Sequence, residues 1–294
     1  MTDRIVEIAD TAAHLSLENH LLKIRLPDGS SSTLPVAELQ CLILANPAAT
    51  VTGALLAELA AAGGVAVICG RDRLPAAMQL PLNGNYVQSE RFRAQADASL
   101  PLRKRLWQCV VKEKIRRQGA LLRELHGDDF GLSKLSAAVN SGDPENQEGR
   151  AAVIYWKNLF CTPFLRDREN ADNNLLLNYG YAILRAMAAR ACCAAGLHPT
   201  LGIHHHNRYD SCCLADDLME PFRCVIDRKV AELNPENAAV GELTRPLRAE
   251  LLRALLERQE TRAGEEWRIS DLLRSSAQQL AESFLSGEMK LNYR

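Results

Sequence analysis

A change of hydrophobic periodicity divides this sequence into two parts. Over the first seventy or so residues, short apolar runs with interleaved polar residues predict β-strands at 5–8, 14–17, 21–26 and 65–69. The Pro-Asp-Gly turn at 27–29 links two of these strands as a hairpin. The Ala- and Leu-rich stretch 52–62, with Thr52 as a plausible N-cap and two glycines after it, predicts one short helix. We therefore expect a mainly β N-terminal part.

The second part follows a stretch rich in turn residues. Residues 76–86 contain a proline and an Asn-Gly pair without useful periodicity, which is typical of a linker. Beyond it, apolar spacings of three and four predict α-helices at 89–125, 148–160, 174–195, 214–233, 243–259 and 270–285. The predicted fold class is α+β, with a small N-terminal β domain at 1–75, a linker at 76–86 and a larger all-α domain at 87–294.

Composition excludes several classes of protein. With 294 residues, of which 47% are hydrophobic and 24% charged, the chain resembles ordinary globular proteins and is long enough for a sizeable core. No apolar run reaches the length of a membrane span and the N-terminus lacks the apolar stretch of a signal peptide, so we expect a cytoplasmic protein. The net charge of −1 excludes uniform attraction to nucleic acid, so DNA contact requires a local patch.

A first candidate for chemistry is a glutamate near the start of a predicted helix. Asp143 is positioned as an N-cap and Pro144 as the first helical residue, which places Glu148 about one turn inside. Small residues beside it, Gly149 among them, leave the carboxylate open to a metal ion or a DNA backbone. The alternative is a solvated glutamate without a function, because the helix dipole stabilises acidic side chains near a helix N-terminus. This segment alone favours the simpler interpretation.

The second candidate is a run of three histidines followed by an acidic helix. Residues 204–206 lie on a non-helical stretch, and alternation along an extended chain would turn His205 away from its two neighbours. In the following helix, Asp217 and Glu220 are three residues apart and share a face. One histidine with two carboxylates is a donor set that suits Mn²⁺ and tolerates Mg²⁺.

Two other interpretations of these residues stay open. A structural zinc site would use His204, His206, Cys212 and Cys213, although adjacent cysteines are awkward for tetrahedral ligation. Alternatively, the histidines are polar loop residues, and the acids, Asp216 included, are the usual ones of a helix start. From the residues alone this last interpretation is favoured.

Three segments, in order and separation, resemble the core motifs of a known family. NQEGRAA around Glu148, GLHPTLGIHH ending at His205 and LADDLMEPFR around Glu220 are similar to those of the CRISPR-associated adaptation integrases, the Cas1 family, and most similar to its type II branch. The resemblance covers nearly the whole chain. It implies that Glu148, His205 and Glu220 are catalytic metal ligands, that Asp217 supports them, and that the metal is Mg²⁺ or Mn²⁺.

The resemblance also implies a function and partners. The expected activity is that of a metal-dependent DNA endonuclease and integrase, which joins the 3′-OH ends of short foreign DNA fragments to the CRISPR repeat array by transesterification. This is spacer acquisition in antiviral defence. The implied partners are double-stranded DNA, a second copy of the chain bound through the β domain, a Cas2 dimer in a heterohexamer, and the type II effector nuclease. The rival functions are a general DNA-hydrolysing nuclease and a non-catalytic DNA-binding scaffold.

A local basic patch is present despite the near-neutral charge. Residues 90–125 contain ten basic and four acidic side chains, which makes this predicted helical region the best candidate for contacting DNA phosphates. The residues that we expect to contribute are Arg103, Lys104 and Arg105. The alternative is a solvated helix face with ion pairs four residues apart, for which Glu113 and Arg117 are suitably spaced.

Overall fold

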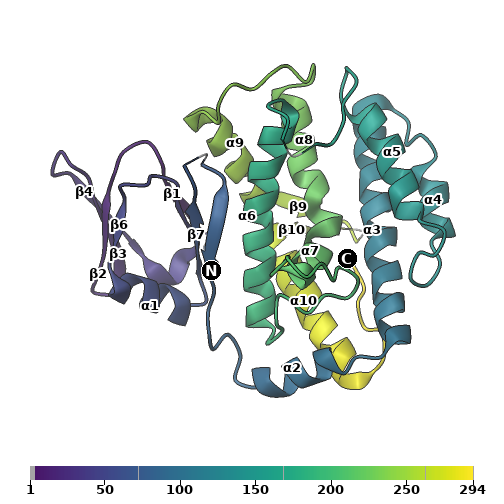
Figure 1. Cartoon of the computed structure of the whole chain (residues 1–294), viewed down its shortest axis with the longest axis horizontal. Coiled ribbons are helices and arrows are strands. Elements are labelled where there is room, and N and C mark those ends of the chain that lie inside the picture. The colour runs from purple at the N-terminus through teal and green to yellow at the C-terminus, as the bar shows by residue number, and fades with distance from the viewer. Residues whose placement is uncertain (1–3, 72, 168, 262, 294) are drawn as a thin grey trace.

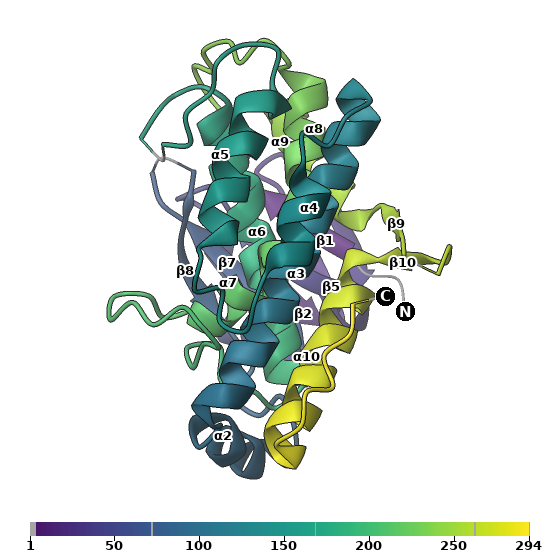
Figure 2. The ribbon, with the colours of Figure 1, turned by 90° about the vertical axis from the view of Figure 1, so that its right-hand side faces the viewer.

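The computed structural model describes residues 4–71, 73–167, 169–261 and 263–293. Two β-sheets and one helix lie at one end of the molecule, and a group of helices forms the rest (Figure 1). Turned by 90°, the molecule shows the helices in front of the sheets (Figure 2). The predicted α+β class is confirmed.

The N-terminal region is built from eight strands and helix α1 (Gly53–Ala61). The strands are β1 (Arg4–Ile8), β2 (His14–Glu18), β3 (Leu21–Arg25), β4 (Ser31–Pro35), β5 (Leu39–Leu44), β6 (Thr50–Val51), β7 (Val65–Cys69) and β8 (Pro75–Gln79), with a 3-10 turn at Val36–Glu38. One sheet has the order β1-β5-β7-β8 and is parallel except for β8. The other has the order β4-β3-β2-β6, in which β2 to β4 form an antiparallel meander.

Strand β5 shows how the two regions pack together. Cys41 and Ile43 belong to the main core with the helices, whereas Leu42 belongs to a second core with Leu55 and Leu59 of α1. Neighbouring residues of a strand face opposite sides, so a continuous apolar run is buried on both faces. The first sheet is therefore a middle layer, with α1 and the second sheet on one side and helices on the other.

The N-terminal predictions hold except at the linker. The four predicted strands and the helix are present, and Thr52 caps α1 by accepting a hydrogen bond from the backbone N–H of Leu55 (3.4 Å). The predicted linker at 76–86 is wrong at its start, because β8 pairs with β7 as far as Gln79. Pro75 is tolerated as the first residue of an edge strand. The division into domains at 1–75 and 87–294 stays a prediction.

The helical region contains nine α-helices in its described part: α2 (Gln88–Ala96), α3 (Leu100–His126), α4 (Leu132–Ala138), α5 (Gln147–Leu159), α6 (Asn173–Ala194), α7 (Cys213–Met219), α8 (Arg223–Leu233), α9 (Arg245–Leu256) and α10 (Ile269–Ser286). Helix α6 is central and packs against the first sheet and against α7, α8, α9 and α10. Gly180 allows α8 to approach, since a Cβ atom there would lie 2.5 Å from Ile226. No helix among the described residues is long and apolar enough to cross a membrane.

Three predictions for this region need correction. The helix expected at 89–125 is two helices, because Ser99 caps a new helix that has proline in its first turn. The helix expected at 214–233 is interrupted by a 3-10 turn at Glu220–Phe222, where Pro221 cannot donate a backbone hydrogen bond. The region is not all-α, since β9 (Arg258–Glu260) and β10 (Glu266–Arg268) form a hairpin. Strands of three residues are too short to give a visible alternation.

Candidate metal centre

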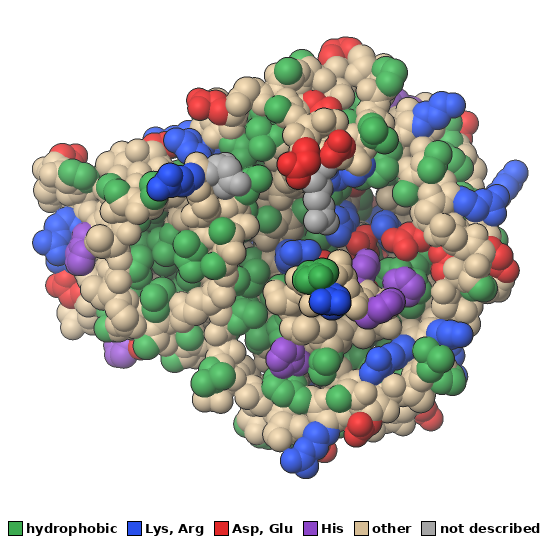
Figure 3. Space-filling view, viewed as in Figure 1, with side chains coloured by type: hydrophobic (Ala, Val, Ile, Leu, Met, Phe, Trp, Pro, Cys, Tyr) green, Lys and Arg blue, Asp and Glu red, His purple; other side chains and the backbone are tan. Residues whose placement is uncertain are grey.

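The predicted site residues come from three separate elements of the helical region. Acidic, basic and histidine side chains gather around a hollow there (Figure 3). Glu148 lies at the start of α5, His205 in the loop between α6 and α7, and Glu220 in the turn between α7 and α8. Lys114 of α3 bridges the two glutamates: its Nζ lies 2.6 Å from Oε1 of Glu148 and 2.7 Å from Oε2 of Glu220. The two carboxylates therefore share one ammonium group.

Glu148 is the second residue of α5 rather than one turn inside it. The N-cap is Asn146, in the left-handed conformation, and its side chain accepts a hydrogen bond from the N–H of Gly149 (3.1 Å). Asp143, the predicted N-cap, lies before the helix, but its carboxylate accepts hydrogen bonds from the N–H groups of Gln147 (2.8 Å) and Glu148 (2.9 Å). Two side chains thus share the capping of the first turn, which shifts the helix start.

Asp217 is fully buried and binds the loop that carries the three histidines. Its carboxylate accepts hydrogen bonds from the backbone N–H groups of Ile203 (2.6 Å), His204 (3.0 Å) and His205 (3.3 Å), and lies 2.6 Å from Nδ1 of His205. The hydrogen bond to Asp217 raises the pKa of His205. An imidazole whose Nδ1 donates to a carboxylate presents Nε2 outward, which is the usual arrangement of a metal-bound histidine.

The loop is not the regular extended segment that was predicted. Trp107 of α3 stacks on His204, with ring centroids 4.2 Å apart, and meets His205 edge-on at 5.6 Å. His206 is exposed and lies with Nδ1 2.7 Å from the carbonyl oxygen of His204. Alternation fails because three consecutive N–H groups turn toward one carboxylate. Gly202 permits this turn, since a Cβ atom there would collide with the carbonyl oxygen of His205.

Glu220 is buried between two cations. Its Oε1 lies 2.9 Å from Nη2 of Arg223, and its Oε2 faces Lys114. Burial alone would raise the pKa of Glu220, but Arg223 and Lys114 outweigh it and lower the pKa to about 2. Burial likewise opposes the charge of Lys114, whose pKa is nevertheless raised by Glu220 and Glu148. Although its charge is paired, Oε2 of Glu220 has no well-directed hydrogen bond among the described residues.

The donor set fits a divalent cation. Two carboxylates and one imidazole with its Nδ1 already engaged are ligands that Mg²⁺ and Mn²⁺ accept, and the poorly satisfied oxygen of Glu220 is buried at this place. In the part of the chain that the structure describes, no three His, Cys, Asp or Glu side chains already stand close enough to share a metal ion. The ammonium of Lys114 lies between Glu148 and Glu220 and pairs with both carboxylates.

Comparison with known proteins decides the family. The protein-family model described as "CRISPR associated protein Cas1" matches residues 6–240 of this chain. The chain belongs to the Cas1 family. The CRISPR-associated endonuclease Cas1 of Neisseria meningitidis serogroup C is 35% identical over 244 residues, which cover 82% of this chain and 79% of that protein. The predicted family is therefore confirmed, and the chain is a Cas1 endonuclease and integrase of CRISPR adaptation.

Solved structures support the fold of this Cas1 protein. A casposase bound to its integration product has a TM-score of 0.79 at 19% identity, covering 98% of this chain and 92% of that one. A Cas6-RT-Cas1–Cas2 complex has a TM-score of 0.76 at 17% identity, covering all of this chain and 36% of that one. At such identities the likeness extends to the fold alone.

Sequence reasoning missed two residues of the candidate site. Lys114 was grouped with the basic residues expected to contact DNA, and its place between two glutamates depends on the packing of α3 against α5 and the Glu220 turn. Arg223 follows Glu220 by three residues. This spacing favours ion pairs on a helix, so the sequence could have predicted the contact between Arg223 and Glu220. Asp216, one of the acids near the start of α7, pairs with Arg185, with Nε 2.6 Å from Oδ1.

Most basic side chains of residues 90–125 in this Cas1 protein contact the protein itself. Arg117 lies 2.6 Å from Glu113, as the ion-pair alternative predicted. Of the three residues expected to contact DNA, Arg103 donates a hydrogen bond to the last carbonyl oxygen of α2 (2.9 Å). Lys104 and Arg105 are exposed. The patch is therefore smaller than its residue count indicates.

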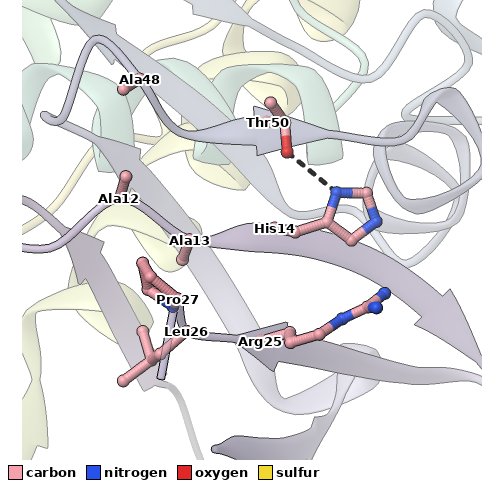
Figure 4. A pocket seen from close by; sticks show the side chains of 8 residues that line it. All are labelled: Ala12, Ala13, His14, Arg25, Leu26, Pro27, Ala48 and Thr50. Atoms are coloured by element: carbon pink, nitrogen blue, oxygen red, sulfur yellow. Dashed lines mark hydrogen bonds between the residues drawn. The ribbon is translucent and has the colours of Figure 1, made fainter. Parts of the chain in front are cut away.

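A second hollow lies in the β region of the Cas1 protein (Figure 4). Its polar side chains are those of His14, Arg25 and Thr50, and Nδ1 of His14 lies 2.8 Å from Oγ1 of Thr50. The remaining lining residues are Ala12, Ala13, Leu26, Pro27 and Ala48. With no carboxylate in its lining, this hollow lacks the donors that Mg²⁺ or Mn²⁺ needs.

Proposed function

We propose that Glu148, His205 and Glu220 hold Mg²⁺ or Mn²⁺, and that this centre joins the 3′-OH end of a short DNA fragment to a phosphodiester of the CRISPR repeat. Two observations carry the proposal: buried Asp217 pairs with Nδ1 of His205, and the carboxylates of Glu148 and Glu220 share one cation, Lys114. A carboxylate behind a ligating histidine fixes its orientation and makes the other nitrogen a better ligand.

The residues present account for the chemistry that joining requires. The fragment's 3′-hydroxyl loses its proton and forms a new P–O bond, while the repeat strand's 3′-oxygen leaves and gains a proton, so one phosphodiester replaces another. When bound, a divalent ion neutralises the charge that builds on the phosphate oxygens. Glu148 and Glu220 supply the negative charge that holds it, and His205 adds a neutral ligand. Arg223 and Trp107 keep Glu220 and His205 in place.

A cavity lined by Arg223, the partner of Glu220, supports a path for the DNA backbone. It has a volume of about 290 Å³ and is bounded by three arginines of different elements, Arg166, Arg185 and Arg223. Its other lining residues are Leu74, Pro75, Glu169, Asn178, Tyr181, Ala182 and Met219. Guanidinium groups recognise phosphate oxygens through charge-assisted hydrogen bonds. We propose that a phosphate near the reacting end enters this cavity, with Arg223 between it and the metal ligands.

Strand joining should depend on a divalent ion. Mg²⁺ or Mn²⁺ should support it, and excess chelator should abolish it, because the proposed ligands are one imidazole and carboxylates with no thiolate. The measurement is a joining assay with a labelled fragment and a repeat-containing DNA, resolved by product length. DNA binding in chelator is the control and should persist. Full joining in excess chelator would rule out the metal centre, and shortened DNA without joined product would favour the general nuclease.

We propose that the chain forms a homodimer through the β region. Two such homodimers flank a Cas2 dimer in a heterohexamer. One site joins one DNA end, so joining both ends of a fragment needs two sites at a fixed spacing, which symmetry provides. A protein of similar fold is found in a complex with Cas2, which supports the proposal. We further propose double-stranded fragment and repeat DNA as substrates, and the type II effector nuclease as a partner that supplies fragments.

Lys104 and Arg105 should contribute to DNA binding independently of sequence, because phosphate contacts position DNA without reading bases. Replacing both by glutamine should flatten the dependence of log affinity on log salt by up to about 1.8, at about 0.9 for each phosphate that is no longer neutralised. Arg103→Gln is the matched control: it should leave this slope unchanged and lower the melting temperature, since Arg103 anchors α3 to α2. Affinity measured across a salt series tests this; an unchanged slope in the double variant would place the DNA elsewhere.

A further inference from the structure

Lys114 is a largely buried cation inside the proposed metal site. It lies in the middle of α3, its side chain is only 14% exposed, and its Nζ is 2.6 Å from Oε1 of Glu148 and 2.7 Å from Oε2 of Glu220. A buried ammonium is stable only when it is paired. The two carboxylates therefore determine where the ammonium lies, and the ammonium determines how far apart the carboxylates stand.

Without a metal ion, the two proposed carboxylate ligands are matched by two cations. Glu148 and Glu220 bring two negative charges, and Lys114 and Arg223 bring two positive charges. Arg223 contacts Oε1 of Glu220, whereas Lys114 contacts the other oxygen, Oε2, and Glu148 as well. Of the two cations, only Lys114 lies between both proposed carboxylate ligands. A divalent ion held by both carboxylates would compete with this ammonium for them.

We propose that Lys114 is a built-in competitor for the divalent cation: its ammonium occupies the position between Glu148 and Glu220, and it leaves these carboxylates when the metal binds. This inference rests on the proposed metal centre. Two cations a few ångströms apart repel strongly, most of all away from bulk water. The DNA-free protein therefore binds metal ions more weakly than its two carboxylates and histidine would alone, and Lys114 sets this affinity.

The test is Mn²⁺ binding to the full-length protein without DNA, followed by the electron paramagnetic resonance signal of the free ion. Lys114→Met should bind Mn²⁺ about tenfold or more tightly than the wild type, because a neighbouring positive charge is removed. Lys114→Arg keeps the charge and should keep the weak affinity. Lys112→Met, two residues away on α3 and so directed to another side of the helix, should also leave the affinity unchanged. Lys114→Gln replaces Lys114→Met if the latter fails to fold.

A second readout is thermal stability. In chelator, Lys114→Met should melt below the wild type, because Glu148 and Glu220 lose the cation between them. Mn²⁺ should raise its melting temperature by more than it raises that of the wild type, since a ligand stabilises the fold in proportion to its affinity. Lys112→Met should behave as the wild type does in both conditions.

The double variant Lys114→Met with Glu148→Gln separates this inference from the metal centre itself. If Lys114→Met binds Mn²⁺ more tightly than the wild type and the double variant loses this binding, the result supports both the metal centre and the role of Lys114. Equal affinity in wild type and Lys114→Met, again lost in the double variant, overturns the role of Lys114 and leaves the metal centre in place. Mn²⁺ binding that Glu148→Gln does not affect, or no binding in any variant, overturns the metal centre and this inference with it.

Discussion

Replacing Glu148 by alanine is expected to reduce strand joining by about 10³-fold while the protein stays folded, because metal stabilisation of the transition state is worth several kcal/mol. Glu148 is partly exposed, and Lys114 would keep Glu220 as a partner. His205→Ala should have an effect of similar size on joining. Glu220 is 5% exposed and pairs with two cations, so its removal should also destabilise the fold, by about 3–5 kcal/mol. Glu220→Gln is therefore the cleaner variant.

The neighbouring histidines provide the controls for this prediction. His204→Ala should be milder, because it loses the stacking on Trp107 but not a proposed ligand. His206→Ala should be close to wild type, since that side chain is exposed and contacts the loop backbone. The measurement is the initial rate of joined product at saturating DNA, with circular dichroism and gel filtration to confirm folding. Wild-type joining by His205→Ala together with abolished joining by His204→Ala would place the ligand one residue earlier.

Replacing Asp217 by alanine is expected to impair both stability and joining. Three backbone N–H groups and the His205 imidazole would lose their common acceptor in a buried place, so we expect the free energy of unfolding to fall by about 3–5 kcal/mol. The residual folded protein should join DNA about 10–100-fold more slowly, the usual cost of losing the group that orients a metal-bound histidine. Chemical denaturation and joining rates at low temperature measure the two effects.

Asp216→Asn is the matched control for Asp217. It changes an adjacent buried carboxylate that pairs with Arg185, whereas the backbone N–H groups of residues 203–205 donate to Asp217. It should cost stability but leave the joining rate of the folded protein near that of the wild type. If Asp217→Ala lost only stability and the folded fraction joined DNA at the wild-type rate, Asp217 would be a structural residue without influence on His205.

The fold could be predicted in outline because local patterns specify it. Strands such as β2 and β3 alternate apolar and polar residues, and long helices such as α6 repeat apolar residues at three and four. Strand β5 was missed because it is buried on both faces and therefore does not alternate. Strand β4 was missed for the opposite reason, since its residues are mostly exposed and polar.

The candidate site was accessible from motif order more than from physical pattern. Taken alone, Glu148 was indistinguishable from an ordinary helix-start acid, and only the resemblance of three segments singled it out with His205 and Glu220. The contacts of Asp217 and Lys114 were beyond reach, because they depend on how a loop, a turn and two helices meet in space. Alternation separated the side chains of His204 and His205, whereas both contact Trp107, since a buried carboxylate bends the loop.

The most direct test of the metal centre is a crystal structure of the protein with Mn²⁺ and a DNA end, with anomalous scattering recorded to locate the ion. The proposed centre requires an anomalous peak bound by Glu148, Glu220 and Nε2 of His205, with Nδ1 of His205 still on Asp217 and the ammonium of Lys114 displaced. A peak coordinated by other residues, or a DNA 3′ end positioned without any ion between Glu148 and Glu220, would contradict it.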